Sequence, residues 1–135
     1  MVDTVNKEKR SQIMSLVRGQ DTKPEMIVRR LVFSYGYRYR LHDSKLPGKP
    51  DLVFSGKRKI ICVNGCFWHG HNCSRGNRLP KSNADYWRSK IDRNRERDAT
   101  NAAKLESDGW KVLIIWECEL ANIERIISRI RSFLG

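Results

Sequence analysis

The chain has 135 residues, enough for one domain with a single core and too few for two, so we expect a single domain over residues 1–135. Its 27 Lys and Arg outnumber 15 Asp and Glu, and this net charge of +12 favours a polyanionic partner, nucleic acid above all, over an acidic membrane surface or a merely cationic surface. Neither a signal-peptide core nor an apolar run of membrane-spanning length occurs, so we expect a cytoplasmic protein that does not associate with a membrane. In that compartment its four cysteines should be thiols or metal ligands and not disulfides.

The amino-terminal part is predicted to hold a basic arm followed by a helix. Residues 5–17, within an arm over residues 1–20, have the pattern of a basic helix with a narrow apolar stripe, either an arm that DNA orders or a fraying terminus. Residues 22–25 form a capping box with a proline in the first turn, so a helix begins there, and Gly36 can end it. Glu25 is either a cap residue or a carboxylate near an active site, and the sequence alone favours the cap.

Three strands are predicted next. Residues 37–41 alternate with one basic face, residues 52–54 are apolar, and residues 59–63 have no polar face and should form a central strand. A turn over residues 55–57 should join the last two as a hairpin. Asp51, held by the preceding proline, then lies at the start of a strand that pairs with the central one.

The rest of the chain is predicted to be helix, strand and helix. A long basic helix runs from Ser82 or Asn83 to Asp108, a buried strand covers residues 110–116, and an amphipathic helix covers residues 123–133. This order of elements predicts an α/β fold, a mixed β-sheet flanked by helices.

A cysteine and histidine cluster follows the central strand. Cys66, His71 and Cys73 share a short loop, and Cys118 comes directly after another strand that could be its neighbour in the sheet. Three thiolates and one imidazole suit a closed, structural Zn²⁺ site, although the spacing is not that of a standard zinc finger; the alternative is a set of isolated buried thiols. Cys62 lies inside the apolar strand, where a thiol acts as a small hydrophobe, so we exclude it.

His69 and Asp51 together suggest phosphodiester cleavage. A carboxylate can hold Mg²⁺, the metal stabilises phosphate charge, and a histidine that titrates near neutrality can activate water. Taken singly, Asp51 is more simply a turn residue, and His69 a surface residue or a support of the metal loop.

Several aromatic side chains suggest contact with DNA bases. Phe67 and Trp68 lie in a glycine-flanked loop where at least one ring should be exposed, and Trp87 lies on the basic helix. Exposed apolar rings can wedge between base steps, at lower cost where a mismatch has weakened pairing. The alternative is core packing, which we expect for Trp110 and Trp116.

Motifs along most of the chain carry a family resemblance. They are Thr22 with Glu25, residues 46–51, residues 64–73 (NGCFWHGHNC), Trp87 and residues 110–118. With its basic arm, the chain resembles the very-short-patch repair (Vsr) endonucleases. The resemblance implies a restriction-endonuclease-like fold and a strand-specific DNA endonuclease that nicks 5′ of the mismatched T at T:G mispairs arising from 5-methylcytosine deamination.

The resemblance also implies roles for individual residues. Asp51 binds catalytic Mg²⁺ with help from the backbone carbonyl of Val63, His69 is the general base, and Glu25 is a supporting carboxylate. The family often has Thr-His where this chain has Val63 and Asn64. Asn64 can donate a hydrogen bond but cannot carry charge, so a lower rate or a shifted preference is conceivable.

Further implied roles concern zinc and DNA. Zn²⁺ sits on Cys66, His71, Cys73 and Cys118. Phe67, Trp68 and Trp87 resemble intercalating aromatics, and Met14 and Lys90 occupy positions that could touch the mismatch. The implied partner is double-stranded DNA with a T:G mismatch, with mismatch-repair proteins as further candidates. A monomer is expected because the lesion is asymmetric.

Two other functions compete with the mismatch endonuclease. One is a zinc-stabilised DNA-binding module without catalysis, motivated by Asn64 and by the lack of the usual lysine-containing nuclease motif after Asp51. The other is a restriction-like nuclease acting on sites without a mismatch.

Overall fold

The structure is a computed structural model that describes residues 22–73 and 82–135. The predicted basic arm over residues 1–20, including Met14, lies outside the described residues. Across the described part of the chain, no helix is both long and apolar enough to cross a membrane.

A four-stranded mixed sheet forms the centre of the fold, in the order β1-β2-β3-β4. The strands are β1 (Arg40–Leu41), β2 (Leu52–Phe54), β3 (Lys59–Asn64) and β4 (Lys111–Trp116). The first two pairs are antiparallel and β3 runs parallel to β4. The predicted hairpin and the interior position of the third strand are therefore confirmed, with the 3₁₀ turn η1 (Ser55–Lys57) joining β2 to β3.

Two predicted strands differ from the structure. The strand expected over residues 37–41 is reduced to β1, because β2 offers only three residues and Arg40 and Leu41 pair with Val53 and Leu52. The strand β4, predicted to be buried, is the last in the sheet order, and Ile115 is its one buried residue.

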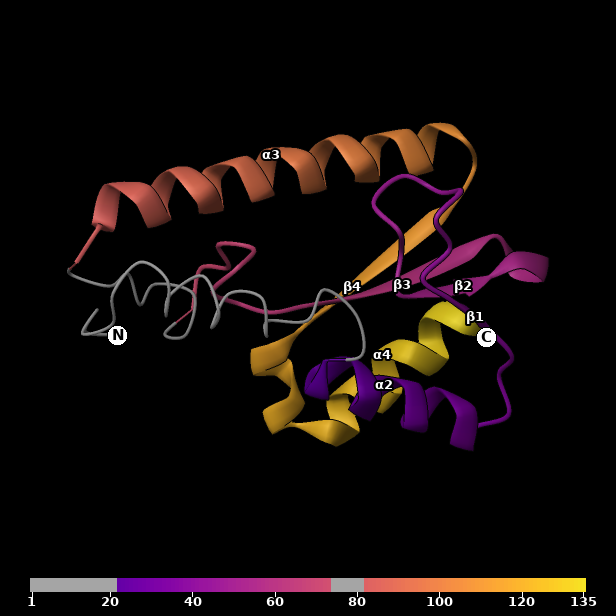
Figure 1. Ribbon diagram of the computed structural model, residues 1–135. Coiled ribbons are helices and arrows are strands. Elements are labelled where there is room, and N and C mark those ends of the chain that lie inside the picture. The colour runs from indigo at the N-terminus through magenta and orange to yellow at the C-terminus, as the bar shows by residue number, and fades with distance from the viewer. Residues whose placement is uncertain (1–21, 74–81) are drawn as a thin grey trace.

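Helices cover both faces of the sheet. Helix α3 (Ala84–Ser107) runs along one face, while α2 (Lys23–Ser34) and α4 (Ile123–Leu134) lie together against the other (Figure 1). A short 3₁₀ segment, η2 (Glu117–Ala121), leads from β4 into α4. This arrangement confirms the predicted α/β fold.

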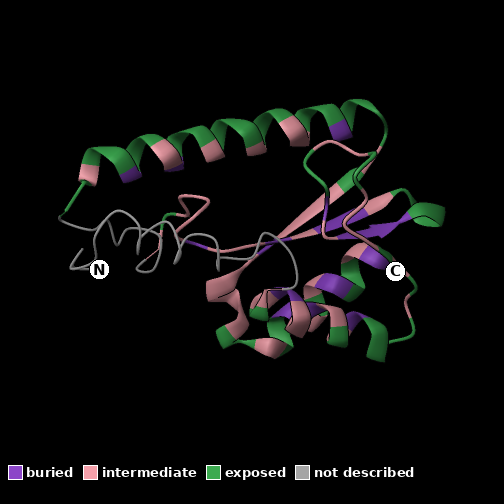
Figure 2. Ribbon diagram, viewed as in Figure 1, coloured by how far each residue is buried: buried purple, intermediate pink, exposed green. Residues whose placement is uncertain are grey.

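The core is divided by the period-two alternation of the strands. Leu52 and Ile61 face the larger apolar cluster with α2 and α4, whereas Val53 and Ile60 face a smaller cluster with Leu105 of α3. Figure 2 shows that the outer side of α3 is exposed along its length. Only the inner face of α3 can therefore pack against the sheet and against the loops that carry the candidate site.

Candidate active site

The loop after β3 is pressed against α3. Gly70 has a φ of +63°, and a Cβ at this position would lie 2.7 Å from Ile91 Cγ2 and 2.6 Å from Arg95 Cδ. The side-chain amide of Asn94 also donates to the carbonyl of Trp68 at 2.9 Å. A glycine is needed here because both the backbone conformation and the close approach exclude a larger residue.

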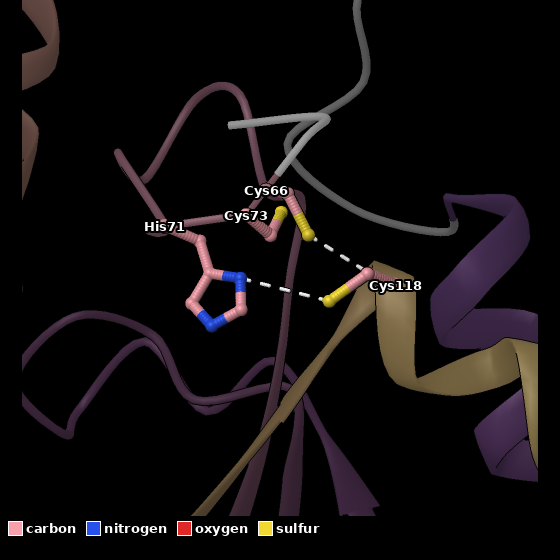
Figure 3. A group of neighbouring side chains, drawn as sticks. All are labelled: Cys66, His71, Cys73 and Cys118. Atoms are coloured by element: carbon pink, nitrogen blue, oxygen red, sulfur yellow. Dashed lines mark hydrogen bonds between the residues drawn. The ribbon is translucent and has the colours of Figure 1, made fainter. Parts of the chain in front are cut away.

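The four predicted zinc ligands meet at one end of the sheet. In the parallel pair of β3 and β4, Asn64 lies opposite Trp116, so Cys66 and Cys118 both come two residues later at the same edge. Figure 3 shows their side chains pointing toward those of His71 and Cys73. The ligand atoms of these four residues lie within 4.8 Å of one another, so the group could hold a metal ion.

Contacts inside this group already orient the donors. The backbone N–H of Cys118 donates to Cys66 Sγ at 3.3 Å, and Cys118 Sγ lies 3.6 Å from His71 Nδ1. The ring of His71 stacks on Trp116 at 4.2 Å and 14°. Burial raises the pKa of the Cys66 thiol to about 12. A set of three sulfurs and one ring nitrogen matches the ligands that tetrahedral Zn²⁺ takes, and metal coordination would displace the thiol protons.

Asp51 and His69 face a common pocket of about 170 Å³ beside this cluster. Val63, Asn64 and Asp98 also line it. The backbone N–H of Val63 donates to Asp51 Oδ2 at 2.7 Å, and this hydrogen bond fixes the carboxylate near the C-terminal end of β3. The structure thus brings together an acid, an imidazole and a strand end that are separate in the sequence.

Burial dominates the electrostatics of Asp51. The pKa of the carboxyl is raised from 3.8 to about 7, mainly by burial and also by the neighbouring Glu25, while the Val63 N–H opposes the shift. A second carboxylate close by disfavours the ionised form unless a cation compensates. The site is therefore arranged to accept a positive charge.

Glu25 lies at the cap of α2, and its side chain also points toward the candidate site. Its backbone N–H donates to Thr22 Oγ1 at 3.3 Å, which is the predicted cap. Its side chain is buried, with 1% of the residue exposed, and lies in one group with His42 and Asp51 whose ligand atoms are within 4.8 Å of one another. The helical spacing of Glu25 with the core residues Val28 and Val32 is the signal that this carboxylate points inward.

Asp98 and His42 are further residues of the candidate site, and the sequence did not reveal them. Asp98 Oδ2 lies 2.5 Å from His69 Nδ1, and His42 Nε2 lies 2.8 Å from Glu25 Oε2. A signal for Asp98 was present, since it continues the helical face of Ile91 and Asn94. His42 had none, because it lies in a loop.

The three predicted intercalating aromatics form one cluster. The centroid of the Phe67 ring lies 5.1 Å from that of Trp68 and 5.8 Å from that of Trp87, and the two indoles are 5.7 Å apart. Trp87 is 6% exposed, and both loop rings are partly buried, so the expectation of an exposed loop ring was wrong. Lys90 Nζ lies 5.7 Å from the Trp68 ring centroid.

The two tryptophans expected in the core are only partly buried. Trp116 supports His71, as described above, and Trp110 packs on the smaller apolar cluster with the guanidinium of Arg58 4.6 Å from its ring centroid. Trp110 therefore joins an apolar cluster to a cationic group, whereas Trp116 stacks on a candidate metal ligand.

The sequence is similar to those of several known proteins. A family model described as DNA mismatch endonuclease Vsr matches residues 2–75. The chain is 47% identical over 134 residues to Type II nicking enzyme V.XorIIP of Xanthomonas oryzae pv. oryzae, covering 99% of this chain and 98% of that protein. It is 37% identical over 126 residues to DNA mismatch endonuclease Vsr of Escherichia coli, covering 93% of this chain and 80% of that protein.

A solved structure supports the same assignment at the level of the fold. The catalytic domain of homing endonuclease I-Bth0305I superposes with a TM-score of 0.56 and 23% sequence identity, covering 84% of this chain and 94% of that one. The predicted restriction-endonuclease-like fold is thus confirmed. From its sequence over nearly its whole length, the chain belongs to the DNA mismatch endonuclease Vsr family and is a DNA endonuclease.

Proposed function

We propose that this protein nicks one strand of double-stranded DNA 5′ of the mismatched T at T:G mispairs that arise from 5-methylcytosine deamination, in a Mg²⁺-dependent reaction. The observation that carries the proposal is the shared pocket of Asp51 and His69 beside a Cys and His cluster. The names of the relatives support it, since one is called a mismatch endonuclease and another a nicking enzyme.

Asp51 is the proposed ligand of catalytic Mg²⁺. Its carboxylate is a hard oxygen donor, and the carbonyl of Val63 is the proposed second ligand. Bound Mg²⁺ would offset the negative charge that develops on the phosphate during hydrolysis. Glu25 adds a second carboxylate beside Asp51, which strengthens the preference of the site for a cation.

His69 is the proposed general base. An ionised carboxylate can only accept, so Asp98 holds the hydrogen of the imidazole on Nδ1 and leaves the lone pair on Nε2. That nitrogen can take a proton from water as the water oxygen attacks phosphorus and the P–O bond of the leaving strand breaks. Asn64, which lines the same pocket, can donate a hydrogen bond to a phosphate oxygen.

Zn²⁺ is the proposed structural metal on Cys66, His71, Cys73 and Cys118. A closed four-ligand zinc site stabilises the segment that carries its ligands. His69 lies between two of these ligands in the sequence, so the zinc loop would also hold the general base in place. This connection gives the zinc site a role in catalysis without contact to the substrate.

The proposed DNA contacts lie on the aromatic cluster and its neighbours. Phe67 and Trp68 are the wedge, and the buried Trp87 supports both rings from α3. Lys90 and Met14 are proposed to touch the mismatch, and the basic arm over residues 1–20 to contact the duplex. We further propose that residues 1–135 act as a single domain and a monomer in the cytoplasm, with mismatch-repair proteins as further partners.

Two substitutions test the proposed catalytic roles. Asp51→Ala and His69→Ala should each abolish nicking of a T:G duplex while zinc content and DNA affinity stay close to those of the parent. Glu124→Ala, which removes an exposed carboxylate of α4, is the matched control and should nick at the parental rate. Parental rates in either active-site variant would refute the assignment.

The departure at Asn64 favours one alternative, a DNA-binding module without catalysis. In that case the parental protein would bind the T:G duplex but yield no Mg²⁺-dependent product. Asn64→His would then be the variant to test for restored nicking.

A further inference from the structure

We propose that His42 is a positioning residue of the active site: it fixes Glu25 beside Asp51 and thereby sets the affinity of this site for its divalent cation. The inference rests on the proposed function, because it assumes that Asp51 holds the catalytic metal. His42 lies in a loop and belongs to no sequence motif that could have identified it.

His42 connects two elements that meet at the candidate metal site. Its backbone N–H donates to the carbonyl of Asp51 at 3.1 Å, and the preceding residue, Leu41, pairs with Leu52 in the sheet. Its Nε2 lies 2.8 Å from Glu25 Oε2, with side chains that are 12% and 2% exposed. One residue therefore ties the start of β2 to the first turn of α2.

The backbone of His42 is held in an uncommon conformation. Its φ is +47°, in the left-handed region, which residues with a Cβ adopt infrequently. Such conformations are strained and persist where surrounding contacts determine them. The hydrogen bonds to Asp51 and Glu25 are contacts of this kind, and both involve the site.

The imidazole addresses a problem that the two carboxylates create. The ligand atoms of Glu25, His42 and Asp51 lie within 4.8 Å of one another, so the acids would repel each other without a donor or a cation between them. Arg29 Nη1 also approaches Glu25 Oε2, but at 3.5 Å, a longer contact than the one to His42. The imidazole is thus the closer of these two donors and sets the direction of the Glu25 carboxylate.

Loss of this donor should weaken cation binding and leave the fold intact. Groups that orient metal ligands typically change metal affinity by about 10–100-fold when they are removed. The His42 side chain is not among the residues that line the pocket shared by Asp51 and His69. Its effect should therefore reach the metal through Glu25 and should spare the rate at saturating metal.

The test measures Mn²⁺ binding to the zinc-loaded, DNA-free protein by loss of the free-ion EPR signal, with Mg²⁺ as competitor. His42→Ala and Glu25→Gln should each weaken binding by about tenfold, and the double variant should bind no more weakly than either one. Asp43→Ala, in the same loop, is the matched control and should bind as the parent does.

Three results would overturn the inference, two of them in His42→Ala and the double variant. One is parental Mn²⁺ affinity in His42→Ala. The other is an additive loss in the double variant, which would make His42 a direct ligand that acts independently of Glu25. His42→Gln keeps an N–H near the position of Nε2 and should retain parental affinity, so a loss equal to that of His42→Ala would also count against the inference.

A parallel nicking assay separates this inference from the proposed function. His42→Ala should need about tenfold more Mg²⁺ for half-maximal nicking, with little change at saturation. If the parent does not nick at all, the proposed function fails while the binding result still decides the role of His42.

Discussion

Asp51 combines a fixed hydrogen bond with an unfavourable charge. Burial raises its pKa to about 7, so between about pH 4 and 7 the folded chain binds a proton that the unfolded chain has released. The stabilising contribution of the protonated group is fully present below about pH 4 and is lost as the pH rises through 7. At neutral pH and above, the metal-free protein is therefore destabilised by the acid that we propose for catalysis.

Asp51→Asn should relieve this cost. The amide oxygen can still accept from the Val63 N–H, while the repulsion from Glu25 disappears. Without added Mg²⁺, at about pH 8, the zinc-loaded variant should melt a few degrees above the parent, on the order of 3–5 °C per kcal/mol gained, and nick no DNA. At about pH 5 the difference should shrink, because the parental carboxyl is then mostly protonated. An equal or lower melting temperature at the higher pH would contradict this account.

Asp98 tests the proposed state of His69. Asp98→Asn removes the charge that holds the hydrogen on Nδ1 and allows the wrong tautomer, so the nicking rate should fall by about 10²–10⁴-fold. The Mg²⁺ concentration for half-maximal nicking should not change, because Asp98 acts on the imidazole and not on the metal ligand. Combining this change with His69→Ala should cost no more than His69→Ala alone. A parental rate in the single variant would exclude the proposed pairing.

At the scale of elements, the loop after β3 depends on two kinds of contact. One is the group of four metal ligands, and Cys73→Ser should abolish zinc binding and lower the melting temperature, because it removes one of them. Cys62→Ala is the control, since Cys62 lies in β3 outside that group, and it should keep the metal. Metal analysis of the purified proteins distinguishes the two. Full zinc content in Cys73→Ser would remove that residue from the ligand set.

The other contact is the packing of Gly70 against α3. Gly70→Ala introduces both left-handed strain and a clash with Ile91 and Arg95, and it should lower the free energy of unfolding by about 1–3 kcal/mol. Gly36→Ala carries similar strain at a φ of +87° but meets no atom within 4 Å, so it should cost less. Urea unfolding of both variants measures the difference. Equal losses would mean that the loop does not rely on its contact with α3.

Much of this element structure could be predicted because its signals are local. The capping box at Thr22, the apolar run of β3 and the glycine after α3 each mark a boundary through neighbouring residues. The short length of β1 could not be predicted, because it depends on how many residues β2 offers. The partial burial of Phe67 was missed for a related reason, since Trp87 contacts it from a helix that is distant in the sequence.

The same division holds within the candidate site. The predicted metal ligands of the loop are close in sequence, and Cys118 followed from the expectation that its strand is a neighbour in the sheet. His42 and Asp98 act through partners 17 and 29 residues away, which only the folded chain reveals. Asp98 does continue the helical face of Ile91 and Asn94, but polar residues on charged helices and in loops are common, so this pattern did not single out either residue.

At the scale of the whole molecule, the parallel pair of β3 and β4 organises the chemistry. It brings the four candidate metal ligands to one edge of the sheet, while residues of α3 form one wall of the pocket shared by Asp51 and His69. The net charge of +12 provides the attraction for a polyanion. The fold thus gathers the candidate site at one edge of the sheet, in a chain whose positive charge favours DNA as the partner.

The most direct measurement is a strand-resolved cleavage assay on duplexes that carry one T:G mismatch in varied contexts, beside matched C:G duplexes, with and without Mg²⁺. The account predicts a single Mg²⁺-dependent nick 5′ of the mismatched T and no cut in the matched duplexes. Equal cleavage of matched DNA, or binding without a nick in every context, would contradict it.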